Sequence, residues 1–154
     1  MDVHFSSKTN EWFTPDHVFN QLNDRFNFTL DSAATAKNTK CEKFYAEHDD
    51  GLSKCWSNET VWLNPPYGRQ IKNWVKKAKN EAQKGATVVM LIPARTETSY
   101  WHEYIFPHAS EILFVDGRIK FGGSPHNAPF PSAVVIFSAS KHQKISTIAF
   151  KGGE

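Results

Sequence analysis

Apolar side chains recur three and four positions apart in residues 14 to 26 and again in residues 70 to 85. This spacing places them on one face of a helix, with lysines opposite in the second segment. Thr14 suits the N-cap of the first helix and Pro15 its first helical position. A third helix is predicted over residues 97 to 106. The pattern therefore indicates three helices with one apolar face each.

Short apolar runs between these helices have the character of strands. They span residues 28 to 35, 60 to 64, 87 to 94, 111 to 117, 133 to 138 and 145 to 150. The run at 87 to 94 is nearly all apolar, as in a strand covered on both faces. Strands that alternate with helices favour an α/β fold with an open, mainly parallel sheet, here with a C-terminal antiparallel portion. The polar residues 36 to 59 predict a loop.

The composition predicts one folded domain over residues 1 to 154. The chain is 40% hydrophobic and 22% charged, which is typical of globular proteins and excludes the disordered and fibrous classes. No run approaches the roughly 20 apolar residues of a membrane span, and the first residues lack a signal pattern. We therefore expect a cytoplasmic protein with no membrane partner. A net charge of +2 does not by itself indicate nucleic acid.

Cysteine and histidine patterns give no indication of a metal site. Cys41 and Cys55 are the only cysteines and do not form a CxxC pair, so neither a disulfide framework nor a cysteine zinc site is indicated. The seven histidines show no HExxH or comparable ligand spacing. We expect no metal.

Polar or turn-forming residues follow three of the predicted strands. They are Asp31-Ser32-Ala33, Asn64-Pro65-Pro66-Tyr67 and Pro93-Ala94-Arg95. In open α/β sheets, ligands bind at the carboxyl ends of the strands. The sequence therefore predicts one site where these three strand ends meet.

The segment VWLNPPYG ends a strand with a loop that is rich in hydrogen-bond acceptors. Pro65 and Pro66 have no N–H group, Asn64 adds a side-chain oxygen, and Tyr67 adds a flat ring. Such a loop suits a planar amine, because it accepts both N–H groups while the ring stacks on the group that carries them. Accepting both N–H bonds frees the nitrogen lone pair to attack a positioned electrophile. The alternative is a rigid turn that only ends the strand.

Several segments in chain order resemble the compact phage and prophage DNA adenine-N6 methyltransferases of the Dam type. The segments are EWFTP, LDSAA, DDGLSKCW, VWLNPPYG, NWVKKA, GRIKF and FPSAVVIF. The resemblance runs from about Asn10 to Phe137 and implies a compact Rossmann-like fold that uses S-adenosylmethionine. It also implies a phage-infected or lysogenic bacterium as the cellular setting, with methylation that protects DNA from host restriction.

The resemblance assigns roles to the proline loop. Asn64 and the Pro65 carbonyl would accept the two protons of the adenine amine, Pro66 would fix the shape of the loop, and Tyr67 would stack on the base. The adenine would be flipped out of the DNA duplex to reach the loop. Because the chain has little room for a separate target-recognition domain, we expect a sequence preference that is short or weak, or that comes from a second copy or a partner. We expect a monomer or a homodimer.

The resemblance also implies a cofactor site. Its residues would be Trp12, Phe13, Thr14, Asp31, Ala33, Leu52 and one of Asp49 and Asp50, between which the sequence does not choose. The first strand lacks the glycine-rich FxGxG loop of many methyltransferases and carries small residues instead. Only 33 residues separate Asp31 from Asn64 (64 minus 31), so we expect a shortened second βα unit.

Basic residues near the strand ends predict a rim for DNA phosphates. They are Lys37, Lys40, Lys43, Arg69, Arg95, Arg118 and Lys120. Phe121 lies with Arg118 in a Gly/Pro-rich segment that the resemblance makes a wall of the adenine pocket. Two rival functions stay open: methylation of a protein glutamine or of RNA, and a non-catalytic DNA-binding relic of the fold.

Overall fold

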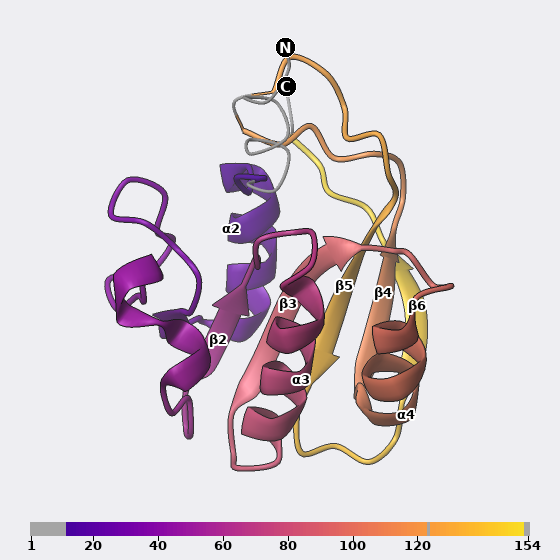
Figure 1. Ribbon diagram of the computed structural model, residues 1–154. Helices are drawn as coiled ribbons and strands as arrows, with labels where there is room; N and C mark the ends of the chain where they lie inside the picture. The colour runs from indigo at the N-terminus through magenta and orange to yellow at the C-terminus, as the bar shows by residue number, and fades with distance from the viewer. Residues whose placement is uncertain (1–11, 123, 153–154) are drawn as a thin grey trace.

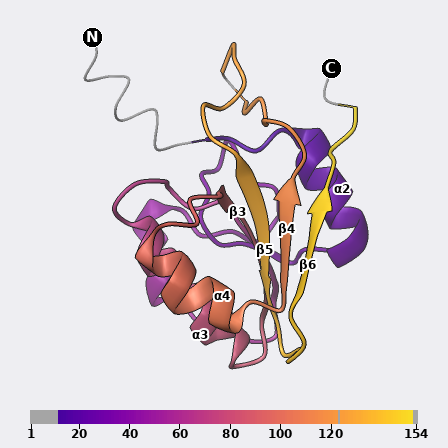
Figure 2. The ribbon, with the colours of Figure 1, turned by 90° about the vertical axis from the view of Figure 1, so that its right-hand side faces the viewer.

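The structure, a computed structural model, describes residues 12–122 and 124–152. A single six-stranded sheet has the order β1-β2-β3-β5-β4-β6. The elements are α2 (Asp16–Phe26), β1 (Leu30–Asp31), β2 (Thr60–Leu63), α3 (Ile71–Ala82), β3 (Thr87–Pro93), α4 (Phe106–His108), β4 (Glu111–Val115), β5 (Ser132–Phe137) and β6 (Lys144–Ile148). Helices α3 and α4 cover one face of the sheet and α2 the other (Figure 1, Figure 2).

The sheet is mixed: the predicted antiparallel portion is present, but the sheet is less parallel than predicted. Three strand pairs are parallel (β1 with β2, β2 with β3, β4 with β6), and two are antiparallel (β3 with β5, β4 with β5). Strand β5 is therefore antiparallel to both of its neighbours and lies inside the sheet, not at an edge. Because β3 and β4 occupy both edges of β5, β6 pairs with the free edge of β4.

Helix α2 buries Val18, Phe19 and Leu22, as its apolar spacing predicts. The predicted N-cap is wrong. Pro15 occupies the N-cap position, and no side chain caps the helix. The hydroxyl of Thr14 instead accepts a hydrogen bond from the Asn64 side chain, a long-range contact that local capping patterns do not reveal.

Helix α3 buries the predicted apolar stripe and one residue more. The stripe consists of Ile71, Trp74, Val75, Ala78 and Ala82, and the additional buried residue is Glu81. Gly85 follows the helix with φ +108°, a conformation that favours glycine. Trp74 faces the connection that links β1 to β2, so this face of α3 also contributes to the site described below.

The connection from β1 to β2 is compact, as the short spacing predicts. Strand β1 has two residues, and beside it the Asp31 N–H donates to the Lys43 carbonyl and the Tyr45 N–H donates to the Asp31 carbonyl, both at 3.0 Å. Two 3₁₀ turns follow, Glu47–Asp49 and Gly51–Ser53. No α-helix lies in this described span, so a bridged loop with two turns takes the place of a second βα unit.

The helix predicted over residues 97 to 106 is displaced and irregular. A π-helical turn, Trp101–Ile105, leads directly into α4 and buries Trp101 and Ile105. Apolar spacing located the helix, but it does not distinguish an α-turn from a π-turn. None of the helices in the described part of the chain is long and apolar enough to cross a membrane.

Candidate active site

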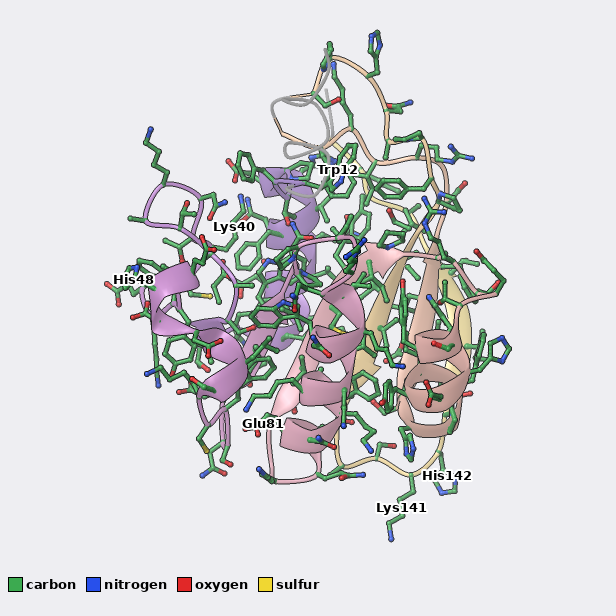
Figure 3. The ribbon with its side chains drawn as sticks, in the orientation of Figure 1. Trp12, Lys40, His48, Glu81, Lys141 and His142 are labelled. Carbon is green, nitrogen blue, oxygen red and sulfur yellow. The ribbon has the colours of Figure 1, made fainter. Side chains whose placement is uncertain are left out.

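A cavity of about 460 Å³ lies at the carboxyl ends of β1 and β2. Ten of the predicted site residues line it: Trp12, Phe13, Thr14, Asp31, Ala33, Asp50, Leu52, Asn64, Pro65 and Pro66. The parallel register of β1 and β2 sets Asp31 beside Trp62, which brings the ends of both strands to one edge. Figure 3 shows Trp12 and Lys40 toward this end of the molecule and His142 at the other.

Asn64 lines the cavity, and its side chain has one hydrogen-bond acceptor without a partner among the described residues. Its Nδ2 donates to the Trp12 carbonyl and, at 3.0 Å, to the Thr14 hydroxyl. Because a carbonyl only accepts, the amide nitrogen must face Trp12, and the oxygen takes the other position. That oxygen, Oδ1, is buried and has no hydrogen-bond partner among the described residues. Leaving a buried acceptor unpaired costs about 1 to 3 kcal/mol, so this oxygen is suited to accept from a donor that water or a ligand brings.

The two prolines extend this acceptor surface. Pro65 is buried and Pro66 exposed, and both line the cavity next to Asn64. Neither has an N–H group to offer. Within the described residues, no backbone hydrogen bond ends on the Pro65 carbonyl. The two prolines therefore add no N–H donor beside the Asn64 side chain.

Tyr67 lies behind the proline loop and does not line the cavity. Its ring is 7% exposed and packs edge-on against Phe121 and Phe130, with centroids 6.4 and 5.7 Å away. Its hydroxyl donates to the Leu91 carbonyl at 2.9 Å. Burial raises the pKa of Tyr67 well above its ordinary value, so the hydroxyl stays a donor. In this conformation the ring has no free face for a base, and stacking requires the phenylalanines to move.

Asp31 is a buried carboxylate with one free oxygen. Its Oδ2 accepts from the Lys40 backbone N–H at 2.9 Å, while the buried Oδ1 has no partner among the described residues. Burial raises the pKa of Asp31 from 3.8 to about 6, against the opposing effect of the Lys40 backbone N–H. A cationic ligand group would offset that burial, so the cavity floor favours positive charge.

The structure distinguishes the two candidate aspartates, Asp49 and Asp50. Asp49 accepts from the Ala46 N–H at 2.8 Å and closes a turn, whereas Asp50 lines the cavity. Gly51 follows, and a Cβ there would lie 2.4 Å from the Ser32 carbonyl oxygen. Only glycine lets this turn approach the loop after β1 so closely.

For two further residues that line the cavity, the sequence predicted a different role. Lys40, predicted at the phosphate rim, lines the cavity, and its side chain is 17% exposed and paired with Asp16 at 2.7 Å. Trp74, predicted only as part of the apolar stripe of α3, also forms a cavity wall. Its ring lies 3.2 Å from the Cβ position of Gly51. Trp74 lies in the first turn of α3, directly after the proline loop, and this position in the sequence indicates a place beside the cavity.

The predicted DNA-contacting residues divide into two groups. Arg69, Arg95, Arg118 and Lys120 are exposed and follow the carboxyl ends of β2, β3 and β4. Phe121 is 1% exposed and packs against Trp12 with centroids 5.5 Å apart. It has no free surface for DNA in this conformation, because it belongs to the aromatic cluster around Tyr67.

A second hollow, of about 430 Å³, lies at the amino ends of the parallel strands. Arg25, Glu111 and Lys144 line it, and the first two form an ion pair at 2.6 Å. None of the predicted site residues reaches it. No group of three potential metal ligands occurs within residues 12–122 and 124–152.

Comparisons with known proteins show the family of the chain. Residues 4–151 match the family model described as DNA N-6-adenine-methyltransferase (Dam). A DNA N-6-adenine-methyltransferase of Escherichia phage T1 is 37% identical over 110 residues, which are 70% of this chain and 45% of the relative. One of Haemophilus phage HP1 is 31% identical over 113 residues, 71% of this chain and 65% of the relative. The matched segments thus cover less than two thirds of either relative.

A solved structure from Vibrio vulnificus, described as a modification subunit of a type I restriction enzyme, shares the fold. Its TM-score is 0.54 at 9% identity, over 95% of this chain and 49% of that one. Such low identity supports the fold alone. The family match covers nearly the whole length and includes both the proline loop and the Asp31 strand end. The chain belongs to the family of DNA N-6-adenine-methyltransferases (Dam).

Proposed function

We propose that this chain transfers a methyl group from S-adenosylmethionine to the N6 amine of adenine in DNA. The observation that carries the proposal is the unpaired Asn64 Oδ1, buried in the wall of a cavity that also contains Asp31. Family membership supplies the substrate class. The chain matches only part of its relatives' lengths, so the activity of the whole relatives is a proposal for this chain.

On the substrate side, Asn64 and the Pro65 carbonyl are assigned to the two N–H groups of the adenine amine. An amine conjugated to a ring is a weak nucleophile, because its lone pair is delocalised. Two strong acceptors draw the N–H bonds out of the ring plane and return the lone pair to nitrogen. The residues thus act by orientation and electrostatics, without a nucleophilic side chain. The new N–C bond would form as the S–C bond to the methyl group breaks and leaves a neutral thioether, and the methylated amine would then release one proton to solvent.

The cavity fits the cofactor by its chemistry. When bound, S-adenosylmethionine supplies an electrophilic methyl group on a positively charged sulfur. Asp31, with its free buried oxygen, suits the cofactor's ammonium group, and Lys40 suits its carboxylate. Leu52 and Trp74 offer apolar walls for the adenine ring, and Asp50 an acceptor for ribose hydroxyls. A volume of about 460 Å³ lies in the range of small-molecule sites.

DNA is assigned to the edge of the sheet where the cavity opens. The exposed Arg69, Arg95, Arg118 and Lys120 follow strands that end at this edge, where they can contact phosphates. An adenine inside a duplex does not reach a buried oxygen, so we assign a flipped-out base as the substrate. Stacking on Tyr67 then requires Phe121 and Phe130 to move aside when the base enters.

The test is transfer of a labelled methyl group from S-adenosylmethionine to unmethylated DNA, RNA and protein, followed by nucleoside analysis. We expect label in DNA, as N6-methyladenine. Label only on protein or RNA would assign the same acceptor loop to another planar amine. Calorimetry with the cofactor addresses the remaining alternative, since a chain that binds no S-adenosylmethionine at millimolar concentration is a non-catalytic relic.

A further inference from the structure

We propose that Thr14, together with the Trp12 carbonyl, is the positioning device that fixes which end of the Asn64 amide faces the substrate. The inference rests on the proposed function and adds a residue to it. Residues 12 to 14 then do more than line the cavity. Its two acceptors hold the amide nitrogen, so that the oxygen is the only end available to an amine.

The geometry is specific because an amide side chain has two ends of nearly equal size. Turning the group by half a rotation exchanges oxygen and nitrogen at little steric cost. At Asn64 the exchange would set Oδ1 against the Trp12 carbonyl, oxygen against oxygen. It would also present an N–H group to the incoming amine, donor against donor. Nδ2 keeps two acceptors only in the observed orientation.

Thr14 is available for this role because the adjacent helix does not use it. Helix α2 begins after Pro15 and has no side-chain cap, so the Thr14 hydroxyl is not bonded to the first turn. The Thr14 residue is 6% exposed, and its oxygen accepts from Asn64 Nδ2 at 3.0 Å. Residues 14 and 64 are 50 positions apart in the chain, so folding the N-terminal segment onto the strand end completes the acceptor.

The same contacts explain why the first position of this loop is asparagine and not aspartate. A carboxylate has no N–H group, so one of its oxygens would face the Trp12 carbonyl without a donor between them. Thr14 could turn its hydroxyl toward one oxygen, but the Trp12 carbonyl cannot donate. A proton on the carboxyl would restore the missing donor. Asn64→Asp should therefore act as an acid that the fold prefers to keep neutral.

The first test needs no substrate. We expect the Asn64 side-chain N–H protons, followed by NMR in ¹⁵N-labelled free protein, to exchange slowly with solvent. Exchange should be about tenfold faster in Thr14→Val and should slow again in Thr14→Ser, which keeps a hydroxyl. Thr147→Val is the same substitution at an exposed position of β6, and it should leave the exchange rate of the Asn64 side-chain protons unchanged. Equal exchange rates in the wild type and Thr14→Val would remove Thr14 from the proposal.

The second test is the pH dependence of Asn64→Asp. Since the new carboxyl should have a raised pKa in the folded state, its neutral form is favoured and stability is lost as pH rises through that pKa. The melting temperature of the variant, relative to the wild type at each pH, should fall as pH rises above about 4, the ordinary pKa of an aspartate. A difference that does not change with pH would overturn the assigned orientation, whether or not the protein methylates DNA.

The third test separates positioning from binding. Thr14→Val should lower kcat for methyl transfer about 5- to 20-fold, with S-adenosylmethionine affinity within twofold of the wild type. Thr14→Ser should recover most of that rate. An unchanged kcat would contradict the positioning role, and a loss confined to cofactor affinity would return Thr14 to the cofactor site. A wild type without any transfer would instead overturn the proposed function, while the NMR and pH results would still decide the orientation of the amide.

Discussion

At the scale of single residues, two buried oxygen atoms define the site. Asn64 Oδ1 and Asp31 Oδ1 are both buried without a partner among the described residues. Each suits a different ligand group: a neutral amide oxygen accepts from an amine, and a carboxylate attracts a cation. Residue types at strand ends predicted both positions. The partners that orient them were not predictable, because Trp12 and Thr14 reach Asn64 across 50 or more residues of sequence.

For Asp31 we predict that one substitution raises the stability of the free protein and weakens its binding of the cofactor. Burial raises the pKa of Asp31 from 3.8 to about 6, so the folded chain binds a proton more readily than the unfolded chain. Stability should therefore fall as pH rises from about 4 to about 6, by about 3 kcal/mol at most from this group. Asp31→Asn removes the charge, and the free variant should melt above the wild type at pH 7.5 but not at pH 4.

The same variant should bind S-adenosylmethionine about 10- to 100-fold more weakly at pH 7.5, because an amide does not replace a carboxylate beside an ammonium group. Melting curves across this pH range and calorimetry with the cofactor provide the two measurements. A variant that melts below the wild type at pH 7.5, or that binds the cofactor equally well, would contradict the assigned role of Asp31.

At the scale of elements, α3 is hydrogen-bonded to the segment that carries the turn at Gly51, which lines the cavity. Glu81, near the C-terminal end of this helix (Figure 3), is 1% exposed and accepts from the Trp56 backbone N–H at 2.6 Å. Burial alone would raise its pKa, but the Trp56 N–H and Lys77 hold the pKa of Glu81 below its ordinary value. The indole N–H of Trp56 donates to the Gly51 carbonyl at 3.1 Å. One carboxylate thus ties the helix to the turn that carries Asp50.

Glu81→Ala should destabilise the protein by about 2 to 4 kcal/mol, because it leaves the Trp56 N–H and the Lys77 ammonium without their buried acceptor. Cofactor affinity should fall as well, since the turn at Gly51 loses its support. Glu81→Gln keeps an oxygen for Trp56 and should lose less on both measures. Denaturant unfolding and cofactor calorimetry provide the readouts. Equal stability of the alanine variant and the wild type would show that the buried carboxylate does not hold this turn.

At the scale of the whole molecule, periodicity predicted most elements but not how they pair. Every predicted strand exists, and α2 and α3 lie within their predicted ranges. An antiparallel portion was predicted, but the place of β5 between β3 and β4 and the parallel pairing of β6 with the free edge of β4 were not, because strand order depends on which edges are free and not on the sequence of one strand. The carboxyl-end rule for α/β sheets predicted that Asp31 and Asn64 share one cavity, whereas Trp12 and Asp50 were expected there only from the family resemblance. The third predicted strand end, Pro93-Ala94-Arg95, does not line this cavity. The buried position of the Tyr67 ring does not follow from that rule, since it depends on aromatic packing with Phe121 and Phe130.

The most direct test of the central claim is to map N6-methyladenine in DNA from bacteria that lack their own adenine methylases. One culture expresses the wild type and another Asn64→Ala. We expect methylated adenines in a recurring sequence context with the wild type, and about 10²- to 10³-fold slower methylation with the variant at equal soluble protein. DNA without methyladenine despite a folded, cofactor-binding wild type would contradict the account, as would undiminished methylation by the variant.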